Sequence, residues 1–427
     1  MSNQHKKDTV WHPFTQHAIN PNSVHVERAS GASLFTDDGR EIIDAISSWW
    51  VITHGHCDPR ITKAVQEQAA NLEQVIFAGF THSPAEELAA GLMRATKNNF
   101  DHVFYADSGS TAVEVALKMA IGYWIHTGAP RQKIIAFHDG YHGDTFGMMS
   151  TGGPSTYNKV YENFLFEVEH IPVPMAGCEA ESFAAMEAIL KANKDNVAAF
   201  VFEPLVQGAG GMNMYSTDAL NTLCDMARKD GVLLIGDEVM TGFGRTGSMF
   251  AHQQCNFVPD ILCLSKGLTA GFLPMGAALC TGAIYDAFYH KDRSRMFFHS
   301  SSFMGNPLAC AAANASLKIW EDEPVMARIN AIENAHESAA QDFKKRGDVE
   351  NVRQKGTILA MDVAGDQGSG YLSQIQPKLY DLFLSQDVLL RPLGNTIYVL
   401  PPYCISEGEL ARIYDTIHFA LNSICDE

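Results

Sequence analysis

The chain has 427 residues, 46% of them hydrophobic, which is enough for a large buried core spread over two or three packed domains. The formal net charge of -18, with no basic run to offset it, disfavours nucleic acid and anionic membrane surfaces as partners. The nine cysteines are scattered and form no CxxC pair, so we expect neither a disulfide framework nor a zinc site, and a reducing, cytoplasmic location fits best.

Two segments bear on membrane insertion. The N-terminal residues, MSNQHKKDTVWHP, lack the apolar core of a signal peptide. Residues 267–285 carry no charge, but four glycines and a proline interrupt them. We therefore expect loop and strand there rather than a membrane helix.

Beyond about residue 60, apolar runs of strand length alternate with helical patterns such as TAVEVALKMAIGYW and CDMARKD. This alternation is typical of an α/β fold, in which helices cover a mostly parallel sheet. The predicted strands are HVFYA (102–106), KIIAF (133–137), VAAFVF (197–202), VLLIGD (232–237), ILCLS (261–265) and AALCT (277–281).

The pattern changes near residue 324, where long amphipathic helices such as VMARINAIENAHESAAQDFKKR mix with a few strands. We expect a large domain over residues 60–323 and a smaller α+β domain over residues 324–427. The N-terminal segment, residues 1–59, is expected to join the smaller domain or lie across it.

The first candidate site follows the strand at 102–106, where Asp107, Ser108, Gly109 and Ser110 lead into an amphipathic helix. Backbone N–H groups at a helix start, a glycine that allows close approach and two hydroxyls make a cup for a phosphate. A simple N-cap made by a serine or aspartate is the alternative that this segment alone leaves open.

The second candidate lies in VLLIGDEVMTGFGRTG, where Gly242, Gly244 and Gly247 match the letters of a dinucleotide-binding GxGxxG. That motif requires an amphipathic helix directly after the glycines, and SMFAHQQCNFVPD does not read as one. The segment does offer Asp237 at the end of an apolar strand, where a buried carboxylate needs a cationic or proton-sharing partner.

The third candidate is Lys266, which emerges where the strand at 261–265 stops, the usual place for chemistry in an open α/β sheet. A phosphate cup, a strand-end aspartate and a strand-end lysine are together what pyridoxal 5'-phosphate requires. The lysine forms the Schiff base, the aspartate keeps the pyridine nitrogen protonated, and the helix start holds the phosphate.

The run DEVMTGFGRTG followed by PDILCLSKGL resembles the signature of the class III aminotransferases, and the likeness extends over essentially the whole chain. The resemblance implies a PLP-dependent transferase of fold type I, with a mostly parallel seven-stranded sheet in the large domain. It also implies a homodimer with shared active sites.

A narrower resemblance is to the members of this family that act in biotin synthesis. It implies transfer of an amino group from S-adenosylmethionine to 8-amino-7-oxononanoate, giving 7,8-diaminononanoate. It is carried by WHPFTQ (11–16), SSWWVITHGH (47–56), HDGYHGDT (138–145), FEPLVQGAGGM (202–212) and FMGNPLACAAANASL (303–317).

The resemblance also implies roles toward the cofactor. Lys266 would move the proton as well as form the covalent link, and Tyr141 would stack on the ring. Ser302 would reach the phosphate from the neighbouring subunit, although HSSSF replaces a glycine-containing pattern and puts Ser300 beside the substrate. The full set expected at the cofactor is Ser108, Gly109, Ser110, Tyr141, His142, Glu203, Asp237, Lys266 and Ser302.

For the substrate, Arg391 is the expected carboxylate partner because a guanidinium binds carboxylate bidentately. Trp49, and then Trp50, suit the apolar chain of the keto acid, with core packing as their alternative role. The remaining expected substrate contacts are Phe14, which lies where many relatives carry tyrosine, together with Asp144, Arg245, Ser300 and Tyr398.

Three alternatives stay open. The amino donor can instead be lysine, toward which LTAGFLPM leans, whereas FMGNPLACAAANASL leans toward adenosylmethionine. The chain can also be another ω-amino acid transaminase, or a cofactor-binding regulatory or scaffold protein without turnover. Histidine pairs interrupted by glycines, with no acid or cysteine to complete them, do not indicate a metal site.

Overall fold

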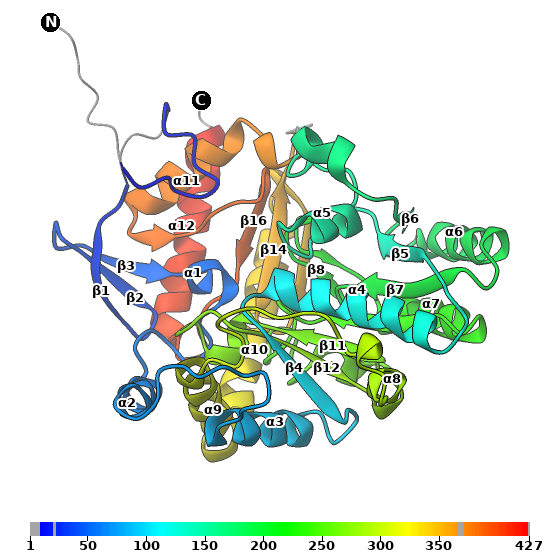
Figure 1. The fold of residues 1–427 in the computed structure, drawn as a ribbon. Coiled ribbons are helices and arrows are strands. Elements are labelled where there is room, and N and C mark those ends of the chain that lie inside the picture. Colours follow the sequence, from blue (N-terminus) through cyan, green and yellow to red (C-terminus); the bar gives the residue numbers. More distant parts are fainter. Residues whose placement is uncertain (1–8, 20–22, 366–369, 426–427) are drawn as a thin grey trace, which may run out of the picture.

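The computed structural model describes residues 9–19, 23–365 and 370–425. A seven-stranded sheet lies at its centre, in the order β4-β12-β11-β10-β7-β5-β6 (Figure 1). Its strands are β4 (His102–Ala106), β5 (Lys133–Phe137), β6 (Glu169–Ile171), β7 (Val197–Phe202), β10 (Leu233–Asp237), β11 (Ile261–Leu264) and β12 (Gly276–Cys280). Only β12 runs antiparallel to its neighbours, so the predicted mostly parallel sheet is confirmed.

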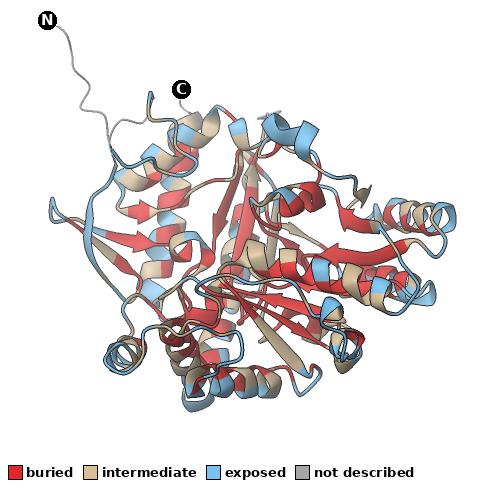
Figure 2. Ribbon diagram, viewed as in Figure 1, coloured by how far each residue is buried: buried red, intermediate tan, exposed pale blue. Residues whose placement is uncertain are grey.

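Helices cover both faces of this sheet because its strands alternate their side chains. In β7, Ala199 and Val201 pack toward α4 (Gly109–His126) and α5 (Phe146–Gly152), whereas Phe200 and Phe202 join the cluster that holds α6 (Glu179–Ala192) and α7 (Thr217–Lys229). Figure 2 shows the resulting buried band through the centre of the molecule. The short strand β6 was not predicted, since three residues carry too little pattern.

Two smaller sheets complete the core. One has the order β13-β14-β16 and the other the order β1-β2-β3-β15. Their strands are β1 (Val26–Ser30), β2 (Ser33–Thr36), β3 (Glu41–Asp44), β13 (Val349–Lys355), β14 (Ile358–Val363), β15 (Val388–Leu389) and β16 (Thr396–Val399), and a two-stranded ribbon joins β8 (Val206–Gln207) to β9 (Asn213–Met214). Because β15 pairs with β3, the N-terminal segment lies against the C-terminal part of the chain. The domain boundaries at 59 and 323 stay predictions.

The remaining helices lie around these sheets (Figure 1). They are α1 (Ser47–Trp50), α2 (Pro59–Ala69), α3 (Ser83–Ala95), α8 (Gly282–Phe288), α9 (Pro307–Asp322), α10 (Val325–Phe343), α11 (Ile375–Ser385) and α12 (Glu407–Cys425), with 3₁₀ turns η1 (Lys159–Phe164), η2 (Ala251–Gln254), η3 (Lys266–Thr269), η4 (Arg293–Arg295) and η5 (Gly370–Leu372). The glycines of the GxGxxG letters lead only into the short η2, as the sequence predicted.

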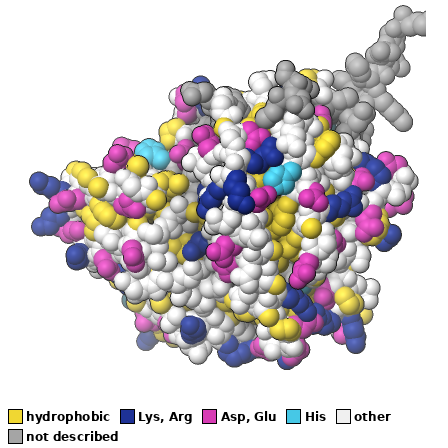
Figure 3. All heavy atoms as spheres, turned by 180° about the vertical axis from the view of Figure 1, so that it is seen from behind, with side chains coloured by type: hydrophobic (Ala, Val, Ile, Leu, Met, Phe, Trp, Pro, Cys, Tyr) yellow, Lys and Arg dark blue, Asp and Glu magenta, His cyan; other side chains and the backbone are white. Residues whose placement is uncertain are grey.

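The described helices include none that is both long and apolar enough to cross a membrane. The uncharged residues 267–285 form part of η3, a loop, β12 and the start of α8. Acidic and basic side chains are interspersed on the face seen in Figure 3. No three histidine, cysteine, aspartate or glutamate side chains gather as a metal site within the described part of the chain.

The sheet topology brings several polar side chains to one edge. Glu203, Asp237 and Lys266 lie at the carboxyl ends of β7, β10 and β11, which are neighbouring parallel strands. Ser108 follows β4, which runs in the same direction as β11 because β12 is antiparallel to both. This edge is where ligands bind in open α/β sheets.

Gly276 gives the first testable feature of this edge. A Cβ added there would lie 2.2 Å from the backbone oxygen of Ser108. The strand β12 can therefore pass this close to the start of α4 only because residue 276 is glycine. We expect Gly276→Ala to lower the free energy of unfolding by about 1–3 kcal/mol, measured by urea denaturation. Gly347→Ala is the control because its Cβ would meet nothing within 4 Å. Equal stability of the two variants would contradict the tight crossing.

Candidate active site

Two adjoining cavities lie at this edge of the sheet. The inner cavity has a volume of about 150 Å³, and several polar side chains enter its lining of Trp50, Gly109, Ser110, Tyr141, His142, Gly143, Glu203, Asp237, Val239, Met240, Ser265 and Lys266. The outer cavity, of about 300 Å³, is lined by Phe14, Trp49, Trp50, Val51, Tyr141, Tyr157, Ala209, Lys266, Tyr371 and Leu393. Trp50, Tyr141 and Lys266 line both, so the lysine stands where a polar compartment meets an aromatic one.

Lys266 is a half-buried amine at the junction of the two cavities. Burial lowers the pKa of its ammonium to about 8, although the charges of Asp237 and Glu203 act in the opposite direction. Its Nζ lies 4.6 Å from the ring centroid of Trp50, and its backbone has a φ of 46°, in the left-handed region. A lysine with this pKa is partly unprotonated near neutral pH, as a nucleophile or a general base requires.

Asp237 is buried and has the proton-sharing partner that its position predicted. Its Oδ2 lies 2.7 Å from His142 Nδ1, and its Oδ1 accepts a hydrogen bond from the Val239 N–H at 3.0 Å. Burial acts to lower the pKa of His142, but the hydrogen bond and charge of Asp237 outweigh it and raise that pKa. The two side chains therefore form a buried hydrogen-bonded pair in the inner cavity.

Glu203 holds the loops around the inner cavity. Its carboxylate accepts hydrogen bonds from the Tyr141 N–H at 3.0 Å and the Gly208 N–H at 2.9 Å. Burial, with the charge of Asp237, raises the pKa of Glu203 to about 7, against the opposing effect of His142. The hydrogen bond to the Tyr141 N–H holds the backbone that carries this aromatic ring in the cavity wall.

The start of α4 forms a narrow cradle. Ser108 is the N-cap, and its hydroxyl accepts the Thr111 N–H at 3.2 Å, so the N–H groups of Gly109 and Ser110 have no partner within the helix. A Cβ on Gly109 would lie 2.7 Å from Val239 Cγ1, and one on Gly143 would overlap Ser110 Oγ at 1.9 Å. Such free backbone donors beside a confined space suit a phosphate.

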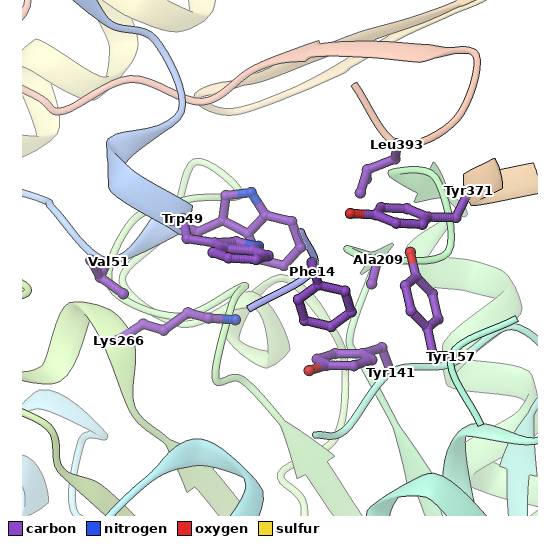
Figure 4. Close-up of a pocket in the computed structure, with 10 residues that line it drawn as sticks. Phe14, Trp49, Val51, Tyr141, Tyr157, Ala209, Lys266, Tyr371 and Leu393 are labelled. Carbon is purple, nitrogen blue, oxygen red and sulfur yellow. The ribbon is translucent and has the colours of Figure 1, made fainter. Parts of the chain in front are cut away.

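The outer cavity is an aromatic cluster (Figure 4). The Phe14 ring lies edge-on to Trp49, Tyr157 and Tyr371, at centroid distances of 5.5, 5.9 and 6.1 Å. The Lys266 side chain points toward this cluster. An apolar chain can therefore lie among the rings while its reacting end meets the lysine.

Arg391 stands at the rim of the aromatic cluster. Its Nη2 donates to the Phe14 carbonyl at 2.9 Å, and its guanidinium carbon lies 5.6 Å from the Trp49 ring centroid. Its Nε is buried and makes no hydrogen bond to any described residue. The guanidinium therefore has donor capacity left for a carboxylate ligand.

Some expected site residues lie elsewhere. Arg245 is buried outside both cavities, and its guanidinium donates to the carbonyls of Trp50, Ile52 and Pro401. Tyr398 lies behind Trp50 and accepts its indole N–H at 3.1 Å, so it supports the cavity wall without lining it. The geometry gives both residues structural contacts where the sequence led us to expect substrate contacts.

Five other expected residues also do not line either cavity: Ser108, which caps α4, Arg391, which stands at the rim, and Asp144, Ser300 and Ser302. Asp144 is exposed and accepts the Tyr141 hydroxyl at 3.0 Å. Ser300 and Ser302 are exposed, and the Ser302 carbonyl accepts a hydrogen bond from Gln74. The role expected for Ser302 belongs to a neighbouring subunit, so this position in a single chain leaves it a prediction.

Several cavity residues were not foreseen. Tyr157 lies in an irregular segment and Tyr371 in the short 3₁₀ turn η5, neither of which has a periodic pattern, and Val51 and Leu393 look like ordinary core residues in the sequence. Gly143 lies in HDGYHGDT, one of the segments that carry the family resemblance, and that segment is the sequence signal that points to it. In the structure Gly143 packs against Ser110 at the start of α4.

Known proteins are similar to this chain over nearly its whole length. The family model for Aminotransferase class-III matches residues 15–421. The chain belongs to the class III aminotransferases. The adenosylmethionine-8-amino-7-oxononanoate aminotransferase of Synechococcus elongatus is 46% identical over 97% of this chain and 99% of its own. The enzyme of the same name from Geobacter sulfurreducens is 35% identical over 97% and 96%.

Solved structures agree with this family. An adenosylmethionine-8-amino-7-oxononanoate aminotransferase from Methanocaldococcus jannaschii superposes with a TM-score of 0.92 at 32% identity, covering 97% of both chains. A PLP-bound amine transaminase from an uncultivated Pseudomonas species gives 0.93 at 30% identity, covering 98% of this chain and all of that one. The predicted fold type I of PLP-dependent transferases is confirmed.

The depressed pKa of Lys266 is directly measurable in this class III aminotransferase. In protein freed of bound ligand, we expect acetylation of Lys266 to follow a midpoint near pH 8, because only the unprotonated amine reacts. Asp237→Asn removes a charge that raises this pKa, so the midpoint should fall further. Peptide mass spectrometry across a pH series gives both values. A midpoint near 10, the value of an ordinary lysine, would contradict the burial argument.

Proposed function

We propose that this class III aminotransferase transfers an amino group from S-adenosylmethionine to 8-amino-7-oxononanoate, giving 7,8-diaminononanoate for biotin synthesis. The observation that carries the proposal is a polar cavity and an aromatic cavity that meet at Lys266, with Arg391 at the rim. Relatives with the corresponding printed name, 46% and 35% identical over nearly the full length, support the choice of substrates.

The inner cavity fits pyridoxal phosphate. Gly109 and Ser110 offer free backbone N–H groups to the phosphate, and Asp237 offers a buried anion to the pyridine nitrogen. When bound, this cofactor supplies a carbonyl group that takes up the amine and a conjugated ring that accepts electrons from the substrate carbon. His142 supports Asp237 in this role because it shares a proton with the carboxylate.

Lys266 and Tyr141 act at the junction of the cavities. Lys266 Nζ removes the proton from the substrate Cα and later returns it, which a pKa of about 8 suits because both protonation states are accessible near neutral pH. Tyr141 flanks the ring, held there through its backbone N–H by Glu203. The outer lining is largely aromatic and apolar, so it offers few hydrogen-bond partners to water beside this step.

Recognition of the keto acid falls to the outer cavity. Arg391 binds the substrate carboxylate with its free donors, and Trp49, Trp50 and Phe14 contact the apolar chain. None of the residues that line the outer cavity is acidic. Adenosylmethionine and lysine each carry a net positive charge, so this lining does not choose between them, and the choice of adenosylmethionine rests on the relatives of that name.

The proposal includes a homodimer in the cytoplasm. Ser302 would act from the partner subunit toward the phosphate, which agrees with its exposure in the single chain. Exposed apolar side chains near it, such as Phe298 and Phe303, support burial of this region by a second copy. The free cysteines of the described residues suit a reducing compartment.

The function is tested by product formation. Purified protein loaded with pyridoxal phosphate is incubated with 8-amino-7-oxononanoate and either adenosylmethionine or lysine, and the diamine is detected by mass spectrometry. We expect product with adenosylmethionine and none with Lys266→Ala. Product with lysine alone would correct the donor, and no product with either donor would reject the proposed reaction.

Arg391→Lys tests carboxylate recognition. The ammonium keeps the charge but loses the guanidinium fork, so we expect KM for the keto acid to rise about 10- to 100-fold with a smaller change in kcat. Steady-state kinetics measure both. Arg60→Lys is the control, since Arg60 pairs with Asp58 and Glu323 away from the cavities. An unchanged KM in Arg391→Lys would remove Arg391 from substrate binding.

A further inference from the structure

The two tryptophans of the outer cavity are carried by a turn of unusual handedness. Residues 47–50, the element α1, are all non-glycine and all have positive φ: 54° at Ser47, 44° at Ser48, 72° at Trp49 and 71° at Trp50. A left-handed turn of L residues pushes each Cβ toward the following carbonyl and is unfavourable at every position. Such a conformation persists only where surrounding contacts hold it.

Asp44, the last residue of β3, supplies those contacts from one side. Its Oδ1 accepts the Ser48 N–H at 2.9 Å, and its Oδ2 accepts the Ser48 hydroxyl at 2.7 Å. The same Oδ2 lies 2.8 Å from His56 Nε2. The carboxylate is fully buried, so these hydrogen bonds replace its hydration. We call Asp44, Ser48 and His56 the Asp44 clamp.

The turn is also fixed at its two ends. The Ser47 hydroxyl donates to the Leu400 carbonyl at 2.8 Å. Arg245 Nη2 donates to the Trp50 and Ile52 carbonyls at 3.1 and 2.8 Å. With both ends tied to other segments, the central residue Ser48 depends on Asp44 for its conformation.

The left-handed turn decides where the indoles lie. Consecutive side chains of a helical turn point about 100° apart, so one turn sends neighbouring tryptophans to two sides of a cavity. Trp50 goes inward beneath Lys266 Nζ, and Trp49 goes outward between Phe14 and Arg391. A right-handed or extended backbone at Ser48 would move both rings out of the outer cavity.

We propose that Asp44 is a positioning residue for substrate specificity, which acts through Ser48 to hold the left-handed turn and thereby places Trp49 and Trp50 against the substrate chain. The inference rests on the proposed function in one respect, namely that the keto acid chain occupies the outer cavity. Asp44 itself lines neither cavity and touches no reacting group.

Asp44→Asn is the primary test. The amide oxygen still accepts the Ser48 N–H, but the amide nitrogen cannot accept from the Ser48 hydroxyl or from His56. We expect KM for 8-amino-7-oxononanoate to rise about ten-fold while kcat stays within about two-fold, because binding in ground and transition states weakens alike. The affinity for pyridoxal phosphate, followed by absorbance titration, should not change. A normal KM would overturn the proposal.

The variant Ser48→Gly tests whether Asp44 acts by holding the left-handed backbone at position 48 or only by stabilising the fold. Glycine adopts positive φ without a Cβ penalty, so the turn no longer needs the clamp. We expect Ser48→Gly to return the KM of Asp44→Asn to within about three-fold of wild type. Ser48→Ala alone should raise KM and Ser48→Gly alone should not, a comparison that decides the matter if Asp44→Asn does not fold. Failure of glycine to restore KM would overturn the proposal.

Asp260→Asn is the matched control. Asp260 also ties a backbone N–H, that of Leu234 at 2.7 Å, but it lies outside both cavities. Asp260→Asn should lower stability without a change in KM. If its KM rose as much as that of Asp44→Asn, the effect at Asp44 would be nonspecific.

A readout independent of the proposed substrate is near-ultraviolet circular dichroism, which reports ordered tryptophans. Asp44→Asn should weaken the tryptophan signal, and Ser48→Gly should restore it. If the wild-type protein does not convert the keto acid, the proposed function fails and this signal alone judges the clamp. An unaltered signal in Asp44→Asn would then reject it.

Discussion

Burial of opposite charges at the ends of three neighbouring strands is the constraint on which the site depends. Asp237 and Glu203 are buried, Lys266 is half-buried, and their charges act on one another across the inner cavity. Burial lowers the pKa of the lysine, whereas the hydrogen bond to Asp237 helps to raise the pKa of His142. Removing any one group leaves another buried charge uncompensated, which couples the chemistry of the site to its fold. The parallel order of β7, β10 and β11 makes this cluster unavoidable.

The outer cavity has a different origin, because its walls come from segments far apart in the sequence. Phe14 precedes the first strand, Trp49 follows β3, and Tyr157 and Tyr371 lie in connecting segments. Their rings meet only in the folded chain, in which the N-terminal strands pair with β15. The inner cavity therefore forms where neighbouring strands end in loops, whereas the outer cavity forms only when distant segments of the chain come together in the fold. Substrate choice can change in the second without loss of the chemistry in the first.

Sequence reasoning succeeded where the signal was local. The six predicted strands agree with the structure to within a residue or so at each end, and Asp237 and Lys266 fall at the strand ends that apolar runs marked. It could not foresee that Tyr157 and Tyr371 converge, since neither has a periodic pattern. The contacts of Arg245 could not be foreseen because a buried guanidinium that holds backbone carbonyls looks like any other arginine in sequence. The four-residue left-handed turn was hidden because non-glycine residues give no warning of positive φ.

The central claim is that Lys266, at the junction of the two cavities, serves the transfer of an amino group from adenosylmethionine to a keto acid. The most direct test is the absorbance of the bound cofactor during a single turnover. Adenosylmethionine alone should bleach the yellow protein, and 8-amino-7-oxononanoate should then restore the colour, because each half-reaction is separable in a ping-pong enzyme. An absorbance that adenosylmethionine leaves unchanged, at concentrations where another amine bleaches it, would contradict the account.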